Sequence, residues 1–171
     1  MVSLTSLRYG LAVVFIAMVI TSFVVTLNAT YLLLTAYAIT NQVDIPWSEL
    51  TLNASAKPSL NFTFVVKNPV SINLHLAYVK FEGYIYESFQ AFQTGEPPLL
   101  KKEHAQTFYP HISLNATANT TITIEISNVE SVLSIEPPKA WFIVIYLQLS
   151  DAPLLGNRAI IKRYVMFETN F

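Results

Sequence analysis

Residues Gly10–Ile39 read GLAVVFIAMVITSFVVTLNATYLLLTAYAI, a run without a single charged side chain. From Met1 to Val43 the only charged residue is Arg8. About 18 consecutive apolar residues already indicate a membrane-spanning helix, and about 20 suffice to cross a hydrocarbon core about 30 Å thick. The run therefore predicts one apolar helix with length to spare, which tilts in a membrane, emerges from it as a stalk, or packs against copies of itself.

A cleaved signal peptide is the competing interpretation of this segment. The apolar part of a signal peptide is about 7–15 residues long and ends at a small-residue cleavage site. The run is longer than that, and no A-x-A boundary precedes a polar start of a mature chain. We therefore predict a retained helix and divide the chain into an apolar transmembrane or filament-core helix, residues 1–43, and an extracytoplasmic domain, residues 44–171.

The charges that flank the helix predict its orientation. Arg8 precedes the apolar run, and Asp44 is the first charge after it. Because Lys and Arg mark the cytoplasmic flank of a membrane helix, we expect the N-terminus inside and the domain outside. N-x-[ST] sequons, which accept glycans only on exported surfaces, agree with this orientation. Asn28 is expected to lie in the membrane or too close to it, which leaves as glycosylation candidates Asn53, Asn61, Asn115 and Asn119.

The composition excludes several classes of protein. The net charge is −1 and only 12% of residues are charged, so the chain lacks the basic footprint of a nucleic-acid-binding protein. It has no cysteine, which rules out disulfides, iron–sulfur clusters and thiolate zinc sites. Weakly charged, cysteine-free surfaces rich in Thr, Asn and sequons resemble those of archaeal surface proteins, so we expect an archaeal envelope protein.

Beyond the helix the hydrophobic pattern changes to a period of two. Residues Leu60–Lys67 alternate as a half-buried strand does, and Asn68-Pro69 ends them. Thr120–Ser127 alternates in the same way, whereas Trp141–Leu149 is apolar on both faces, as a central strand should be. About seven or eight short strands separated by turns predict a mainly β fold, an antiparallel, Ig-like β-sandwich.

Other segments of the domain are assigned less directly. Asn128–Ile135 predicts one short helix with Asn128 as its cap, and Phe81–Glu87 a separate strand with a bulge at Gly83. Asp151–Asn157 is expected to be a hairpin loop. Leu99–Tyr109 fits strand, helix or loop equally well.

The run NFTFVVKNPVSINLHLAYVKFEGYIYE (Asn61–Glu87) resembles the signature of LEA14/WHy-type domains. In that family a strand ends in Asn-Pro, two more strands follow, and a polar-alternating strand such as TTITIEIS comes later. The resemblance covers about Leu60–Phe167 and implies a small sandwich with a short helix. It also implies roles in stress tolerance, surface association and binding without a catalytic centre, so it provides no site residues.

A second resemblance concerns VFIAMVI (Val14–Ile20), which is similar to the helix core of archaellins and archaeal type IV pilin-like subunits. Those proteins also carry a β-sandwich after an N-terminal helix, and their helices bundle into a filament core. Two features differ from this pattern. Arg8 would be buried unpaired in a packed core, which is costly, and Met1 is present where a processed pilin has lost its leader.

Few residues could carry out chemistry. His75, His104 and His111 form no metal-binding motif and are expected at the surface, the last two beside a loop. Glu82 and Glu87, the one pair that invites comparison with a glycosidase, fall on opposite faces of a strand and are expected to be solvated or edge-strand charges. We therefore predict no catalytic, cofactor-binding or metal-binding residue, no cofactor and no enzymatic activity.

Two clusters offer surfaces for binding instead. Lys101-Lys102-Glu103-His104 is the densest charge cluster and is expected in an exposed loop or docking patch. Four tyrosines either form an exposed aromatic strip or pack at the rim of the core: Tyr78, Tyr84, Tyr86 and Tyr109.

The leading hypothesis is a non-enzymatic structural or adhesion protein of the cell envelope, anchored by one N-terminal helix with an external LEA14-like β-sandwich. A subunit or accessory component of a pilus- or archaellum-like filament is the first alternative. A lipid- or sugar-binding module, using the sandwich interior or the tyrosine strip, is the second. The expected partners are membrane lipid or copies of the chain through the helix, and other envelope proteins.

Overall fold

The computed structural model describes residues 4–151 and 158–171. The chain divides into two compact units, Met1–Tyr37 and Ala38–Phe171. Helix α1 extends over Leu4–Gln42 without interruption. Its portion Arg8–Gln42 is long and apolar enough to cross a membrane, a property that it shares with signal sequences. Most of its apolar side chains are exposed, whereas Ile39 near its end is buried.

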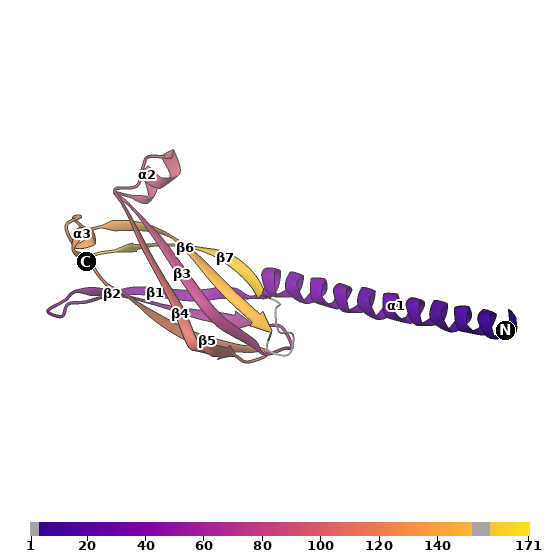
Figure 1. Ribbon diagram of the computed structural model, residues 1–171. Helices are drawn as coiled ribbons and strands as arrows, with labels where there is room; N and C mark the ends of the chain where they lie inside the picture. Colours follow the sequence, from indigo (N-terminus) through magenta and orange to yellow (C-terminus); the bar gives the residue numbers. More distant parts are fainter. Residues whose placement is uncertain (1–3, 152–157) are drawn as a thin grey trace. The chain divides into compact units, whose positions relative to one another are not determined.

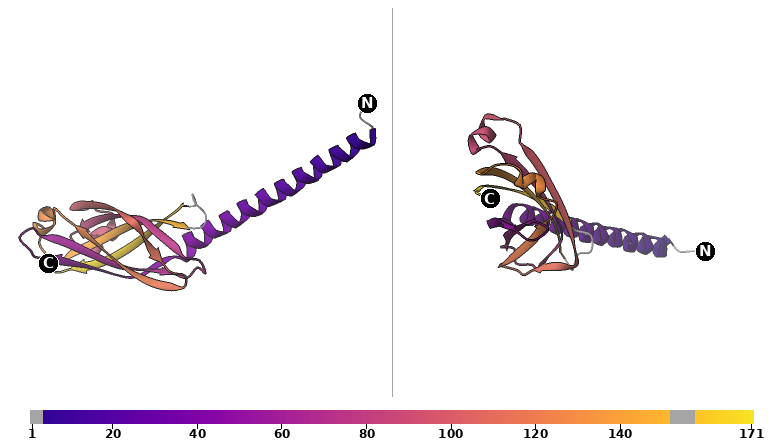
Figure 2. Two further views of the ribbon diagram at one scale, coloured as in Figure 1. Left: turned by 60° about the horizontal axis from the view of Figure 1, so that its bottom comes forward. Right: turned by 90° about the vertical axis from the view of Figure 1, so that its left-hand side faces the viewer.

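The second unit contains two antiparallel sheets, which confirms the mainly β fold expected from the sequence. The three-stranded sheet has the order β1-β2-β5 and the four-stranded sheet the order β4-β3-β6-β7 (Figures 1 and 2). The strands are β1 (Asp44–Asn53), β2 (Ser59–Asn68), β3 (Leu74–Tyr86), β4 (Leu100–Leu114), β5 (Ala118–Ile126), β6 (Lys139–Asp151) and β7 (Arg158–Thr169).

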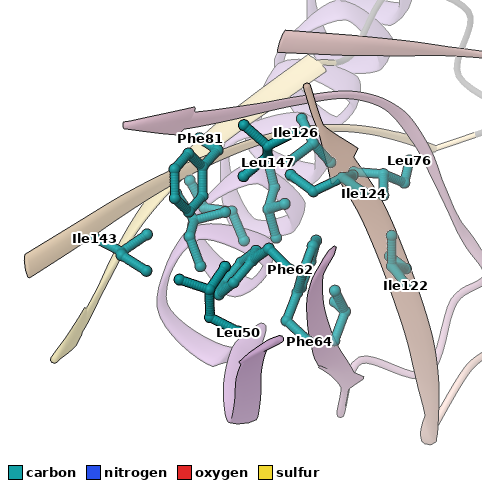
Figure 3. Packing of buried hydrophobic residues seen from close by; sticks show 14 of the residues in the cluster. Leu50, Phe62, Phe64, Leu76, Phe81, Ile122, Ile124, Ile126, Ile143 and Leu147 are labelled. Carbon is teal, nitrogen blue, oxygen red and sulfur yellow. The ribbon is translucent and has the colours of Figure 1, made fainter. Parts of the chain in front are cut away.

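The core lies between the two sheets and follows from the period-two pattern. Alternate residues of each strand point inward, and in Figure 3 side chains from both sheets meet there. Phe62 of β2 and Phe81 of β3 join the two layers, with ring centroids 5.2 Å apart. The apolar segment Trp141–Leu149 lies in β6 between β3 and β7, as predicted for a central strand.

The two tryptophans lie in contrasting places. Trp141 is fully buried, and its indole Nε1 donates a hydrogen bond to Thr169 Oγ1 at 3.1 Å. Trp47, in β1, is 47% exposed.

Strand β3 corrects two predictions. The segments expected as separate strands form one strand, and the register shift lies between Leu76 and Tyr78 instead of at Gly83. A Cβ at Gly83 would come within 2.9 Å of the rings of Phe81 and Trp141. The glycine therefore makes room for these two aromatic side chains, a role that a single sequence does not reveal.

Helix α2 (Phe89–Thr94) was not predicted. Figures 1 and 2 show it at the tip of the β3–β4 hairpin. Ser88 caps its first turn by accepting a hydrogen bond from the amide of Ala91, and Gly95 ends it with a φ of 77°, which favours glycine. These two residues were the available signal in the sequence.

The predicted short helix near Asn128 is present as α3 (Glu130–Leu133). Its cap was wrongly assigned, because Val129 holds the N-cap position and makes no side-chain hydrogen bond. Asn128 lies one residue earlier with a φ of 57°. Of the loop expected at Asp151–Asn157, residues 152–157 lie outside the described residues.

The Asn-Pro step ends β2 for a reason visible in its contacts. The buried Asn68 amide donates hydrogen bonds to the carbonyls of Ile72 at 3.0 Å, Leu114 at 3.0 Å and Asn115 at 3.2 Å. Its Oδ1 accepts one from the amide of Val70 at 3.2 Å. Asn68 thus joins the β2–β3 turn to the β4–β5 turn from inside the sandwich.

Candidate functional site

The outer face of the four-stranded sheet carries an unusual concentration of rings and charges. The strand register places Tyr84 opposite Phe142, Val144 opposite Tyr164, and Tyr146 opposite Lys162. We call this surface the aromatic face. Its members are Lys80, Glu82, Tyr84, Tyr86, Phe92, Lys101, Phe142, Tyr146, Lys162 and Tyr164.

Phe142 is the centre of the ring contacts. Its ring stacks on Phe92 with centroids 4.9 Å apart and on Tyr164 at 5.6 Å, and Tyr84 lies 6.2 Å away. Phe92 also meets Tyr86 edge-on at 5.3 Å, so its side chain packs helix α2 against the sheet. Such pairs stabilise a structure beyond the area that they bury.

Lysine side chains lie over the tyrosine rings. The Lys162 ammonium is 5.4 Å from the ring centroid of Tyr146 and 5.3 Å from that of Tyr164, and Lys80 lies 5.7 Å from Tyr146. Lys101 lies 5.3 Å from the ring of Tyr84. Hydrogen bonding to Tyr164 and Tyr146 raises the pKa of Lys162, which keeps its positive charge at neutral pH.

A nearly buried carboxylate lies among these rings. Glu82 is only 7% exposed, contacts the Lys80 ammonium, and accepts hydrogen bonds from the hydroxyls of Tyr84 at 3.2 Å and Tyr146 at 3.5 Å. The hydrogen bond from Lys80 lowers the pKa of Glu82 and outweighs burial, which acts in the opposite direction. The prediction that Glu82 is a solvated or edge-strand charge was therefore wrong. Glu82 lies in β3, an inner strand of the sheet, and is covered by Lys80 and Tyr84 of its own strand and by Tyr146 of β6.

The charges of the aromatic face are not fully compensated. Lys80 pairs with Glu82, and Lys101 pairs with Glu103. Among the described residues, Lys162 has no carboxylate within ion-pair distance. The face thus combines exposed rings, of which Tyr164 is 59% exposed, with one cation that lacks an acidic partner.

The outer face of the three-stranded sheet is different. It is rich in threonine and asparagine, and the hydroxyls of Thr63 and Thr123 lie 3.0 Å apart in a hydrogen bond. Of the candidate glycosylation sites, Asn53 and Asn119 are exposed on strands of this sheet, and Asn61 is half-buried in its central strand. Asn115 is exposed in the turn between β4 and β5. Three of the four candidates therefore lie on the three-stranded sheet, and Asn115 directly follows the end of β4.

The other expected site residues do not come together. His104 and His111 lie within β4 and do not flank a loop, so that expectation was wrong. Burial lowers the pKa of the partly covered His104. His75 is half-buried in β3, and Glu87 follows the end of that strand. Within the described residues, no group of three or more metal-ligating side chains is present.

The charge cluster and the tyrosine strip are both revised. Lys101-Lys102-Glu103-His104 is part of strand β4 and not of a loop, so Lys101 and Glu103 face one side and the other two residues the opposite side. Tyr84 and Tyr86 belong to the aromatic face, whereas Tyr109 is 97% exposed and is not part of it.

Sequence reasoning missed Phe92, Phe142, Tyr146, Lys162 and Tyr164, because the register that assembles them is not visible in a single sequence.

No protein-family model matches this sequence, and no curated protein sequence matches it significantly. Several solved structures are similar in fold. A late embryogenesis abundant (LEA) protein shares 10% identity, with a TM-score of 0.48 and coverage of 90% of this chain and 85% of that one. A protein from Arabidopsis thaliana shares 13%, with a TM-score of 0.48 and coverage of 75% and 83%. A protein from Archaeoglobus fulgidus shares 7%, with a TM-score of 0.43 and coverage of 75% and 99%.

Only the first of these structures is described as a LEA protein, the class to which the resemblance of Asn61–Glu87 points. The pilin-like resemblance of Val14–Ile20 is not supported. At these identities and TM-scores the likeness concerns the fold alone, and no residue or activity is carried over.

Proposed function

We propose that this chain is a non-enzymatic protein of the cell envelope, anchored in a membrane by α1, with its N-terminus inside and its β-sandwich outside. In this proposal the sandwich adheres to other envelope components through the aromatic face. The observation that carries the anchoring is the run of exposed apolar side chains along α1, which needs lipid around it.

Two details of α1 support a lipid environment. The hydroxyl of Thr21 donates to the carbonyl of Ala17, and that of Thr26 to the carbonyl of Ser22, both at 2.8 Å. Hydroxyls that bond back to the helix in this way leave no unsatisfied donor toward hydrocarbon. Arg8 on the N-terminal flank and the sequons after the helix favour the proposed orientation.

The anchor is tested with the full chain in intact cells of an exporting host. We expect the protein to resist extraction with alkaline carbonate, and external protease to digest the sandwich. Charged substitutions at the middle of the helix, Ile20→Lys with Val24→Lys, should release the protein from the membrane, because each charge is costly in hydrocarbon. Carbonate extraction of the unaltered chain, or a sandwich protected in intact cells, would contradict the proposal.

The adhesive role is tested by binding of the cells to isolated envelope material. Tyr164→Ala should reduce adhesion, because this ring is the most exposed of the stacked rings that Phe142 joins. Thr121→Ala, on the outer face of the other sheet, serves as the control and should leave adhesion unchanged. Equal adhesion of both variants would show that the aromatic face is not the adhesive surface.

A further inference from the structure

We propose that the ligand of the aromatic face is an acidic polysaccharide, with pyranose rings stacked on Tyr146 and Tyr164 and a sugar carboxylate paired with Lys162. This inference rests on the proposed function of the aromatic face. It names the chemical class of the partner.

The ring arrangement suits a sugar. The apolar C–H groups of a pyranose need an aromatic surface, and its hydroxyls need polar groups beside that surface. The exposed Tyr164 and the half-buried Tyr146 provide both, since each ring ends in a hydroxyl and the Lys162 ammonium lies over both rings at 5.3 and 5.4 Å. Tyr164 lies on β7, an edge strand of the sheet, so a long chain can pass over it without meeting another strand.

The uncompensated charge indicates an acidic sugar. Lys80 and Lys101 each have a carboxylate partner, whereas Lys162 has none among the described residues. A carboxylate on the ligand would complete the same arrangement at Lys162 that Glu82 completes at Lys80. Charge complementarity of this kind provides selectivity more than affinity.

The same residues argue against a lipid surface as the occupant. Glu82 places a carboxylate among the rings, and the hydroxyls of Tyr84 and Tyr146 point to it. Inserting such a group into hydrocarbon, or holding it against an anionic headgroup layer, would cost free energy. A hydroxyl-rich ligand, by contrast, can add donors to this carboxylate.

The positions of the sequons are compatible with a polysaccharide partner. Asn53, Asn61 and Asn119 lie on the three-stranded sheet, so glycans attached there would leave the aromatic face uncovered. A chain-like ligand could then reach the rings.

The test uses the full chain in a phosphatidylcholine nanodisc, because detergents with sugar headgroups would compete. The probe is a polygalacturonate oligomer, and its fully methyl-esterified form is the matched uncharged ligand. We expect binding of the acid form to be about tenfold tighter, since the ester removes the charge and adds only a methyl group. Lys162→Gln should weaken binding of the acid about tenfold and abolish the preference. Tyr164→Ala should weaken binding of both forms.

Lys67→Gln is the control, because Lys67 is an exposed lysine on the other sheet. It should leave both affinities unchanged, and thermal unfolding checks that each variant is folded. Equal affinity for acid and ester, or equal losses for Lys67→Gln and Lys162→Gln, would overturn the inference. So would binding to phosphatidylglycerol vesicles without binding to the oligomer.

The two proposals fail in different ways. If Tyr164→Ala reduces adhesion of cells but no folded variant changes binding of polygalacturonate, only the ligand class is wrong. If adhesion is independent of Tyr164, the proposed function of the face is wrong as well.

Discussion

The two sheets bury the same kind of inner face but present different outer faces. Toward the core, both alternate large apolar side chains, such as Phe62 in β2 and Phe81 in β3. Outward, the three-stranded sheet carries mainly hydroxyl and amide groups, with scattered charges such as Lys67 and Glu125. The four-stranded sheet carries stacked rings with lysines over them and a covered glutamate. Packing of the core involves only the inner face of each sheet, so it places no demand on the outer faces. The contrast between the outer faces is therefore not set by the core, and the proposed function of the aromatic face rests on it.

The largest loss of stability should come from a substitution on the inner side of the three-stranded sheet. Asn68→Ala removes the hydrogen bonds to the carbonyls of Ile72, Leu114 and Asn115. The hydrogen bond to Leu114 is buried. We expect it to lower the free energy of unfolding by about 3 kcal/mol. Urea denaturation of the full chain in detergent, followed by circular dichroism, measures the change. Asn119→Ala, on the outer face of that sheet, is the control and should cost far less. Equal losses would show that the inner contacts of Asn68 are not what stabilises the turns.

The second-largest loss of stability should come from a substitution at the centre of the aromatic face. Phe142→Ala removes ring contacts with Phe92 and Tyr164 on a half-buried side chain and should cost about 2 kcal/mol. Val65→Ala truncates a half-buried apolar side chain on the outer face of the three-stranded sheet and should cost about 1 kcal/mol. The same denaturation experiment compares the two. A larger loss for Val65→Ala would contradict the stabilising role given to the rings.

Glu82 predicts a dependence of stability on pH. Its folded-state pKa lies below its ordinary value of 4.5, so its stabilisation is present above that value and is lost as the pH falls through the folded-state pKa. Glu82→Gln should cost about 1 kcal/mol at pH 7 and should flatten the stability profile below about pH 4.5. Thermal unfolding between pH 7 and pH 3 measures both. Glu125→Gln, which removes an exposed glutamate on the other sheet, is the matched control for the loss of one carboxylate. An unaltered slope in Glu82→Gln would disprove the assignment.

The smallest change in stability should come from removing the hydroxyl pair on the three-stranded sheet. Replacing both Thr63 and Thr123 by Val removes an exposed hydrogen bond but keeps the β-branched shape that strands favour. We expect a change below about 0.5 kcal/mol in the same denaturation assay. A loss comparable to that of Phe142→Ala would remove the distinction between the two outer faces.

The sequence alone was sufficient for the architecture. The charge-free run predicted α1, and the period-two alternation of Leu60–Lys67 and Thr120–Ser127 predicted strands β2 and β5. The first inference uses the length of a continuous apolar run, and the second the burial of one face of a strand. The end of β2 at Asn68 was also predicted, although the carbonyls that Asn68 holds lie in distant turns.

The aromatic face could not be predicted, because it depends on how strands pair. Tyr84, Phe142 and Tyr164 are each unremarkable in their own segments, and only the β3-β6-β7 register brings them together. Glu82 shows the same limit, since its cover comes partly from Tyr146 on a different strand. Helix α2 was missed for a local reason, because six residues are too few to show a helical period.

The two tryptophans give this molecule a built-in optical readout. Trp141 has no solvent-accessible surface and is hydrogen-bonded to Thr169 in the last strand, whereas Trp47 is 47% exposed. Emission from Trp141 should therefore lie at short wavelength and be inaccessible to acrylamide, whereas that from Trp47 should be red-shifted and readily quenched. With Trp47→Phe, the remaining fluorescence reports on the pairing of β6 with β7 and thus on the edge of the sheet where Tyr164 lies.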